Sequence, residues 1–255
     1  MYINMRISAA LKASAIHLIA SLSIALVVAG LVFGLWYPHP YLNFTGGREL
    51  FLMVVGIDVV CGPFLTLILF SPFKHRSELI RDVSLIVVIQ FAALGYGVLT
   101  AWNARPLYLA QEIDRFKIIT SLDLDGANLD QLPVSLRPSL FSGPLTVAIR
   151  SPINEKEREL VMIESVQGGR DYAERPEFYL PYDSVNALKS MKRARPIALF
   201  LQKRPEQVKA AQKLALERKA DITQWMYLPV IARQDWVAVL NKQGQIQGFL
   251  KGDGF

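Results

Sequence analysis

The chain has 255 residues, a formal net charge of +6 at pH 7 and a 52% share of hydrophobic residues. Three long apolar runs between residues 13 and 102 carry almost no charge, a distribution typical of membrane proteins and not of one large soluble core. The single cysteine, Cys61, excludes an internal disulfide and a thiolate metal cluster, and the mixing of acids with Lys and Arg after the third run argues against nucleic-acid binding.

The first apolar run extends from about residue 13 to residue 36. Because about 20 apolar helical residues suffice to cross the hydrocarbon core, this run predicts a spanning helix. A cleaved signal peptide is the alternative, but the run is too long for a signal sequence, and Trp36-Tyr37-Pro38 lacks the small residues of a cleavage site. Met5 would serve as a start as well as Met1 does.

The second and third runs cover residues 50–70 and 83–102, and each is long enough to span the bilayer. Aromatic residues cluster near the ends of the runs, as expected at membrane–water interfaces, with Trp36, Tyr37, Tyr41, Phe70, Phe73 and Trp102 at these positions. The sequence therefore predicts a three-helix transmembrane bundle in a membrane domain formed by residues 1–102.

The flanking charges predict the orientation of these helices. Arg6 and Lys12 precede the first helix, the second connection holds Lys74, Arg76 and Arg81, and the first connection contributes only Arg48. Because Lys and Arg accumulate in short cytoplasmic segments, we expect the N-terminus in the cytoplasm and residues 103–255 on the opposite face.

Residues 103–255 have the pattern of a small α+β soluble domain that ends in an antiparallel β-meander. Asn154 and Asp183 are expected to cap two helices, the second reaching Lys192, and Pro205 is expected to open a third that ends near Arg218. The predicted strands cover residues 107–120, 146–149, 226–232, 236–240 and 246–250, with a turn at 241–244.

The second apolar run contains the most informative polar residue of the chain, Asp58, followed closely by Gly62 and Pro63. A carboxylate at this depth costs roughly 2.5 to 3.5 kcal/mol on insertion scales, and Pro63 removes a backbone donor and frees the carbonyl of Val59. Two costly features so close together predict a site held by neighbouring helices. The site is either a structural clamp of the bundle or a contact for a partner.

Proton or ion transport is a weaker interpretation of Asp58, because the three runs hold no second acid and no Lys or Arg to continue a path. Counting about 1.5 Å per residue from the outer end places Asp58 near the depth of Gly95 and Tyr96. We therefore expect the Tyr96 hydroxyl to pair with Asp58, with Gln90 as the next candidate.

Small residues at helical spacing occur on the first helix, where Ala25 and Ala29, then Gly30 and Gly34, form a small-xxx-small ladder. Such ladders let helix backbones approach each other closely in lipid. The ladder predicts either internal packing, which is the commoner use, or docking of a foreign helix.

No catalytic motif stands out in the sequence: there is no glycine-rich phosphate loop, nucleophile elbow or cluster of metal ligands. The three histidines all precede residue 76, so the soluble domain has none. The acidic stretch Asp123, Asp125, Asn128 and Asp130 has the wrong spacing for a calcium loop and favours an Asx-rich turn. We expect no cofactor, no metal and no enzymatic activity.

Two segments, Gly-Ile-Asp-Val-Val-Cys-Gly-Pro-Phe-Leu-Thr at 56–66 and Arg-Pro-Leu-Tyr through Glu-Ile-Asp-Arg-Phe within 105–116, carry a family likeness. Through them the chain resembles the type IV pilin accessory proteins of Gram-negative bacteria, in particular the TfpZ-like group. The resemblance implies an inner-membrane protein with a periplasmic domain. It also implies a role in the production or assembly of type IV pili through the major pilin, with no enzymatic activity.

Three classes of function thus compete. A non-catalytic accessory or chaperone-like factor for the major pilin is favoured, with the lipid bilayer as its surroundings. An envelope enzyme that modifies pilin would need a base or metal on the outer face, where no histidine is present. A membrane sensor with a periplasmic ligand-binding domain would need an output module, and only short basic segments are expected in the cytoplasm.

Overall fold

The fold is seen in a computed structural model, which describes residues 2–45, 47–124 and 126–255. Met1 and Asp125 therefore lie outside the described residues, and only the backbone of Gly47, Arg48 and Leu50 is described. The chain forms two compact units. Residues 1–35 and 46–103 make the membrane unit, and residues 36–45 and 104–255 make the second unit.

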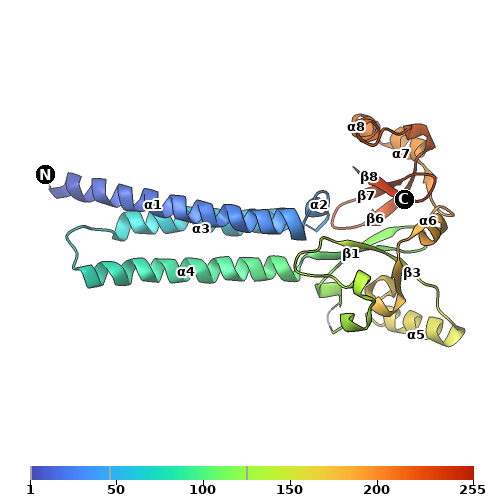
Figure 1. Cartoon of the computed structure of the whole chain (residues 1–255), viewed down its shortest axis with the longest axis horizontal. Helices are drawn as coiled ribbons and strands as arrows, with labels where there is room; N and C mark the ends of the chain where they lie inside the picture. Colours follow the sequence, from blue (N-terminus) through green and yellow to red (C-terminus); the bar gives the residue numbers. More distant parts are fainter. Residues whose placement is uncertain (1, 46, 125) are drawn as a thin grey trace. The chain divides into compact units, whose positions relative to one another are not determined.

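The membrane unit consists of α1 (Tyr2–Leu31), α3 (Gly47–Leu69) and α4 (Arg76–Asn103), with a π-helical turn at Val32–Trp36 after α1. All three helices are long and apolar enough to cross a membrane. Along their lengths α1 packs on α3 and α3 packs on α4 (Figure 1). α1 and α4 begin well before the predicted starts at residues 13 and 83. Both helices continue into polar residues, whose side chains can be solvated by water.

The second unit is built on one mixed sheet. In the described part of the chain its strand order is β4-β3-β1-β2-β6-β7-β8, with β5 beside β6. The pairs β1/β3 and β2/β6 are parallel and the other pairs are antiparallel. The strands are β1 (Pro106–Gln111), β2 (Phe116–Thr120), β3 (Leu145–Ile149), β4 (Tyr179–Pro181), β5 (Arg195–Pro196), β6 (Met226–Ile231), β7 (Trp236–Leu240) and β8 (Ile246–Lys251).

Helices flank this sheet, and two of them begin at the predicted caps. Asn154 Oδ1 accepts from Glu157 N, and Asp183 Oδ1 accepts from Asn186 N. The helices are α2 (Tyr41–Thr45), α5 (Glu155–Val166), α6 (Ser184–Ser190), α7 (Ile197–Lys203) and α8 (Val208–Arg218). Short 3-10 turns lie at Leu122–Leu124, Leu129–Gln131, Val134–Leu136, Tyr172–Glu174, Pro176–Phe178, Pro205–Gln207 and Ile222–Gln224.

The predicted fold class, a three-helix membrane region followed by a small α+β domain with a C-terminal meander, is confirmed. The single strand predicted over 107–120 is wrong, because the chain reverses between Gln111 and Phe116 to form the antiparallel pair β1/β2. Glu112 N donates to Arg115 O at this turn, whose one turn-favouring residue is Asp114.

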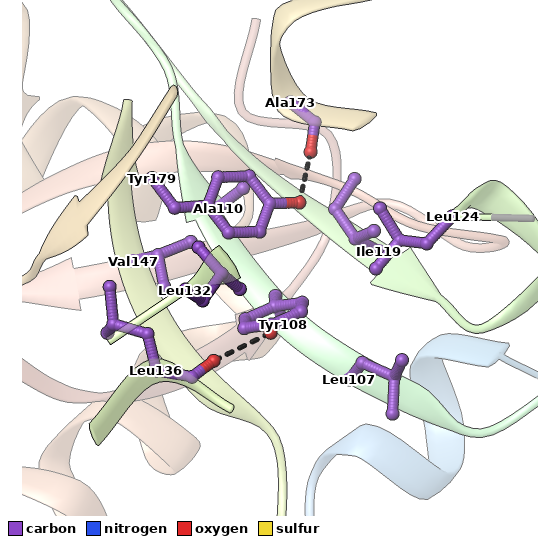
Figure 2. Packing of buried hydrophobic residues seen from close by; sticks show 10 residues of the cluster. All are labelled: Leu107, Tyr108, Ala110, Ile119, Leu124, Leu132, Leu136, Val147, Ala173 and Tyr179. Carbon is purple, nitrogen blue, oxygen red and sulfur yellow. Dashed lines mark hydrogen bonds between the residues drawn. The ribbon is translucent and has the colours of Figure 1, made fainter. Parts of the chain in front are cut away.

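One face of the sheet buries an apolar cluster around Tyr108 and Tyr179 (Figure 2). The two rings pack edge to face, with their centroids 4.8 Å apart. Tyr108 Oη donates to Leu136 O over 2.7 Å, and Tyr179 Oη donates to Ala173 O over 2.6 Å. Burial raises the pKa of both phenols, which keeps them neutral donors. These bonds hold two irregular segments against the sheet.

The connection between α1 and α3, residues 36–45, packs inside the second unit, although the sequence assigned it to the membrane domain. We call it the aromatic connection. Phe44 is fully buried, with ring centroids 5.0 Å from Trp236 and 5.2 Å from Phe249. Arg233 N donates to Phe44 O, and Trp36 Nε1 donates to Leu140 O. The connection is thus part of the core of this unit.

Burial also changes the acidity of groups near the aromatic connection. The pKa of Tyr37 is raised by burial, and the pKa of Arg105 is lowered to about 10 because its guanidinium loses hydration. The pKa of Tyr41 rises to about 12 for the same reason. At neutral pH the tyrosines therefore remain uncharged and Arg105 remains a cation.

Candidate intramembrane site

Polar side chains from all three membrane helices meet inside the membrane unit. Ser14 and His17 come from α1, Asp58 and Thr66 from α3, and Gln90 from α4. In lipid such groups are costly unless they bond to one another, and intramembrane polar residues commonly mark functional sites. This cluster is therefore the candidate site.

His17 joins α1 to both of the other membrane helices. Its Nδ1 lies 2.6 Å from Thr66 Oγ1, and its Nε2 lies 2.6 Å from Gln90 Oε1. Gln90 Nε2 in turn donates to the main-chain oxygen of Asp58 over 2.8 Å, so Gln90 Oε1 is the acceptor that faces the ring. His17 Nε2 is then the donor, and in the neutral imidazole Nδ1 accepts from the Thr66 hydroxyl.

Gly62 and Pro63 make room for this network on α3. A Cβ atom at Gly62 would collide with the side-chain amide of Gln90, so only glycine lets Gln90 lie across α3. Pro63 offers no backbone donor to the carbonyl of Val59, one turn earlier. The carbonyl of Pro63 itself accepts a 2.8 Å hydrogen bond from Ser14 Oγ, which ties α1 to α3 at the defect.

Asp58 is half-buried, and its Oδ2 atom is buried without a hydrogen-bond partner among the described residues. The side chain lines a cavity of about 170 Å³ within the membrane unit. Residues of all three helices form the wall: His17, Ala20, Ser21, Ile24, Ala25, Val55, Asp58, Val59, Val87, Gln90, Phe91 and Leu94. The carboxylate is thus available to a group that enters this cavity.

The predicted pairing of Tyr96 with Asp58 is wrong. Tyr96 is 73% exposed, and the hydrogen bonds of the described chain include none between these two side chains. The reason is the direction in which each residue points around the axis of α4. Gly97 packs against Val54 and lies seven residues after Gln90, so these two positions share the face toward α3, whereas Tyr96 is turned about 100° away. Gln90, the second candidate, does contact Asp58, but at its main-chain oxygen.

The small-residue ladder divides between two surfaces. Ala25 is buried at 7% exposure and lines the cavity, and Ala29 is half-buried. Gly30 and Gly34 are exposed, and a Cβ at either position would have no neighbour within 4 Å. Within this chain, only the alanine half of the ladder lies on the inner side of α1.

Sequence reasoning missed Ser14, His17 and Thr66 as members of the site. A usable signal was present, because Ser14, His17 and Ser21 recur at helical spacing in an otherwise apolar helix, as Asp58, Gly62 and Thr66 do in the next one. No group of three or more His, Cys, Asp or Glu side chains suited to a metal ion occurs in the described ranges. The arrangement is suited to positioning helices and presenting one carboxylate.

The fold and the site define an integral membrane protein with a polar intramembrane cluster and an appended α+β domain. The family model described as "Fimbrial assembly protein FimB" matches residues 5–46. Two Dichelobacter nodosus proteins are similar along 96% of both chains: the fimbrial assembly protein of serogroup I at 34% identity and that of serogroup E1 at 35%.

A third relative, the Dichelobacter nodosus fimbrial assembly protein of serogroups C1 and C2, is 44% identical over 124 residues, which is 49% of this chain and 92% of the relative. No solved structure matches the chain. The chain belongs to the fimbrial assembly protein family. The predicted membership in a pilin accessory family is thereby confirmed, and it gives the protein a role in pilus assembly.

Proposed function

We propose that this protein is a non-catalytic inner-membrane accessory factor that binds the major type IV pilin and steadies it before its assembly into the pilus. The observation that carries this proposal is the full-length similarity to fimbrial assembly proteins in a chain with three membrane-length helices. Before assembly, the subunit would be a single membrane-anchored helix with a globular head. A factor that binds it would need one surface for this helix and one domain that faces the head.

The intramembrane site supports a role in binding over a role in catalysis. His17 uses both ring nitrogens within the chain, toward Thr66 and Gln90, and so holds helices together. The Asp58 carboxylate retains an oxygen for a partner. In lipid, helix association relies on close packing and occasional polar pairs, because lipid tails supply little hydrophobic drive.

The expected topology has two supports. Lys and Arg gather in the first turns of α1, at Arg6 and Lys12, and around the junction of α3 with α4, at Lys74, Arg76 and Arg81. This bias favours a cytoplasmic N-terminus and a periplasmic second unit. The aromatic connection and residues 104–255 form one core, which requires both to lie on the same side of the membrane. The helix pair α3 and α4 between them must then cross the bilayer and return.

The topology is tested with reporter fusions. A reporter after Phe255 is expected to be active only in the periplasm, and one inserted at Ser77 only in the cytoplasm. The opposite pattern at both sites would contradict the proposed orientation.

The function is tested by deleting the gene and restoring it on a plasmid. We expect the deletion to lower pilin stability or the number of surface pili, while the intact mass of pilin stays the same. Immunoblots, pilus counts and intact-mass spectrometry of pilin measure these three quantities. Loss of a glycan or another adduct from pilin would support a modifying enzyme instead, and unchanged pilin and pili would contradict an accessory role.

A further inference from the structure

The membrane unit has one side where its helices do not close on each other. α1 and α4 each pack on α3, and they meet through the 2.6 Å contact between His17 and Gln90. Beyond this contact, toward Ala25 and Leu94, the cavity of about 170 Å³ separates them. We call the space between α1 and α4, with α3 as its floor, the α1–α4 groove.

The size of the cavity limits what it can hold. Small-molecule sites usually enclose about 300 to 1,000 Å³, so this space is too small for a typical cofactor. Its volume suits one large side chain. Ordered water would need two to four polar partners for each molecule, yet most of the lining is aliphatic or aromatic, including Ile24, Val55 and Leu94.

The chemistry of the cavity calls for a hydrogen-bond donor. Asp58 Oδ2 is buried there without a partner in the described chain, and a carboxylate oxygen in lipid is costly to leave unpaired. Gln90 Nε2 gives one of its two hydrogens to Asp58 O, and Ser14 Oγ donates to Pro63 O; neither bonds to Asp58 Oδ2. The Ser21 hydroxyl also lines the cavity, but it makes no hydrogen bond to this oxygen. A donor that enters the cavity from another chain can therefore complete the site.

We propose that the α1–α4 groove receives the membrane helix of the pilin subunit, and that a donor side chain of this helix enters the cavity and bonds to Asp58. This assignment rests on the proposed function, since it takes pilin as the partner. Hydroxyl, amide and amino side chains all have the required chemistry. A helix lying against both α1 and α4 would also close the open side of the unit.

The groove is tested by photocrosslinking in living cells, with a photoreactive phenylalanine analogue at one position of the full-length protein. Ile24 and Leu94 line the cavity. Leu26 and Val88 are controls on the same two helices, because they are 65% and 63% exposed and lie outside the cavity wall. Leu26 follows Ile24 by two residues and so faces the opposite side of α1. We expect pilin adducts from Ile24 and Leu94 and few or none from Leu26 and Val88.

The carboxylate is tested in the same assay. Asp58→Leu removes the acceptor and is expected to lower the adduct yield by roughly three- to thirty-fold, the range that corresponds to one hydrogen bond between membrane helices. Asp58→Asn keeps one acceptor oxygen and is expected to retain more of the yield. Protein level and thermal stability in detergent show whether either variant is folded.

Each result decides between the two proposals. Pilin adducts from Leu26 or Val88 alone would overturn the groove and leave pilin binding intact. Adducts with lipid alone at all four positions would also overturn the groove, and together with unchanged pilin levels in the deletion strain they would overturn the proposed function as well. Full yield from a folded Asp58→Leu variant would overturn the role of the carboxylate.

Discussion

The two units place the same kinds of residue in opposite positions. In the membrane unit large apolar side chains such as Val27, Val60 and Phe91 are more than half exposed, and polar side chains such as His17 and Gln90 are turned inward. In the second unit apolar clusters are buried beneath and between the strands. The difference reflects the solvent, since lipid accepts apolar surface and water does not.

The largest effect is expected at Phe44, because the second unit depends on the burial of apolar side chains. Phe44→Ala leaves a cavity among Trp236 and Phe249 and is expected to lower the free energy of unfolding of this unit by about 3–5 kcal/mol. Urea unfolding in mild detergent, followed by tryptophan fluorescence, measures the change. Phe141→Ala is the control, because Phe141 is 72% exposed and its loss should change stability little.

In the membrane unit the most sensitive position is expected to be Gly62. Gly62→Ala forces the end of the Gln90 side chain away from α3 and is expected to cost its hydrogen bonds, roughly 0.6–2 kcal/mol, seen as earlier unfolding in an SDS titration. Gly95→Ala, with no atom within 4 Å of the new methyl group, should be neutral or slightly stabilising. Equal behaviour of the two variants would mean that Gln90 does not lie across Gly62.

The hydrogen bonds of Gln90 can also be removed without any change at Gly62, and the cost is expected to be no larger. Gln90→Met keeps a similar volume but removes the contacts to His17 and Asp58, and should cost roughly 0.6–2 kcal/mol in the same SDS titration. Ile89→Met, at a 56% exposed position beside it, controls for introducing methionine. A Gln90 variant as stable as the Ile89 variant would refute the bridging role.

The smallest effect is expected at a surface pair of the second unit. Arg150 and Glu157 form two hydrogen bonds of 2.9 and 2.8 Å, and these lower the pKa of Glu157 to about 2 from its usual 4.5. Because the folded state binds the proton less tightly, the pair stabilises above about pH 4.5 and loses this contribution as the pH falls toward 2. Melting temperatures at pH 6, 4 and 3 should therefore fall less in Glu157→Gln than in Glu155→Gln.

Local signals in the sequence predicted many elements correctly. Asn154 and Asp183 cap their helices as expected, and the three strands of the meander lie where alternating apolar residues placed them. These features depend on neighbours within a few positions. The turn after Gln111 was missed because Asp114 is its one turn-favouring residue, with no glycine, proline or asparagine beside it.

The rest depended on contacts between distant residues. Trp36 and Tyr37 had the pattern of an interfacial belt, yet they belong to the second unit and are only 4% and 1% exposed, which spacing along the chain cannot reveal. The sequence located the Asp58 site because acids are rare in lipid. It did not identify the side chains that surround Asp58, because these depend on how each helix is rotated about its axis and on the space at Gly62.

The aromatic connection has a consequence for how the protein is made. Ribosomes deliver residues 36–45 before α3 and α4, while Trp236 and Phe249, against which Phe44 packs, follow both of these helices in the chain. Phe44 therefore cannot meet these two rings until α3 and α4 have been translated. The core of the second unit is thus completed by residues that are synthesised after the third membrane helix, so this unit folds after the membrane helices have been made.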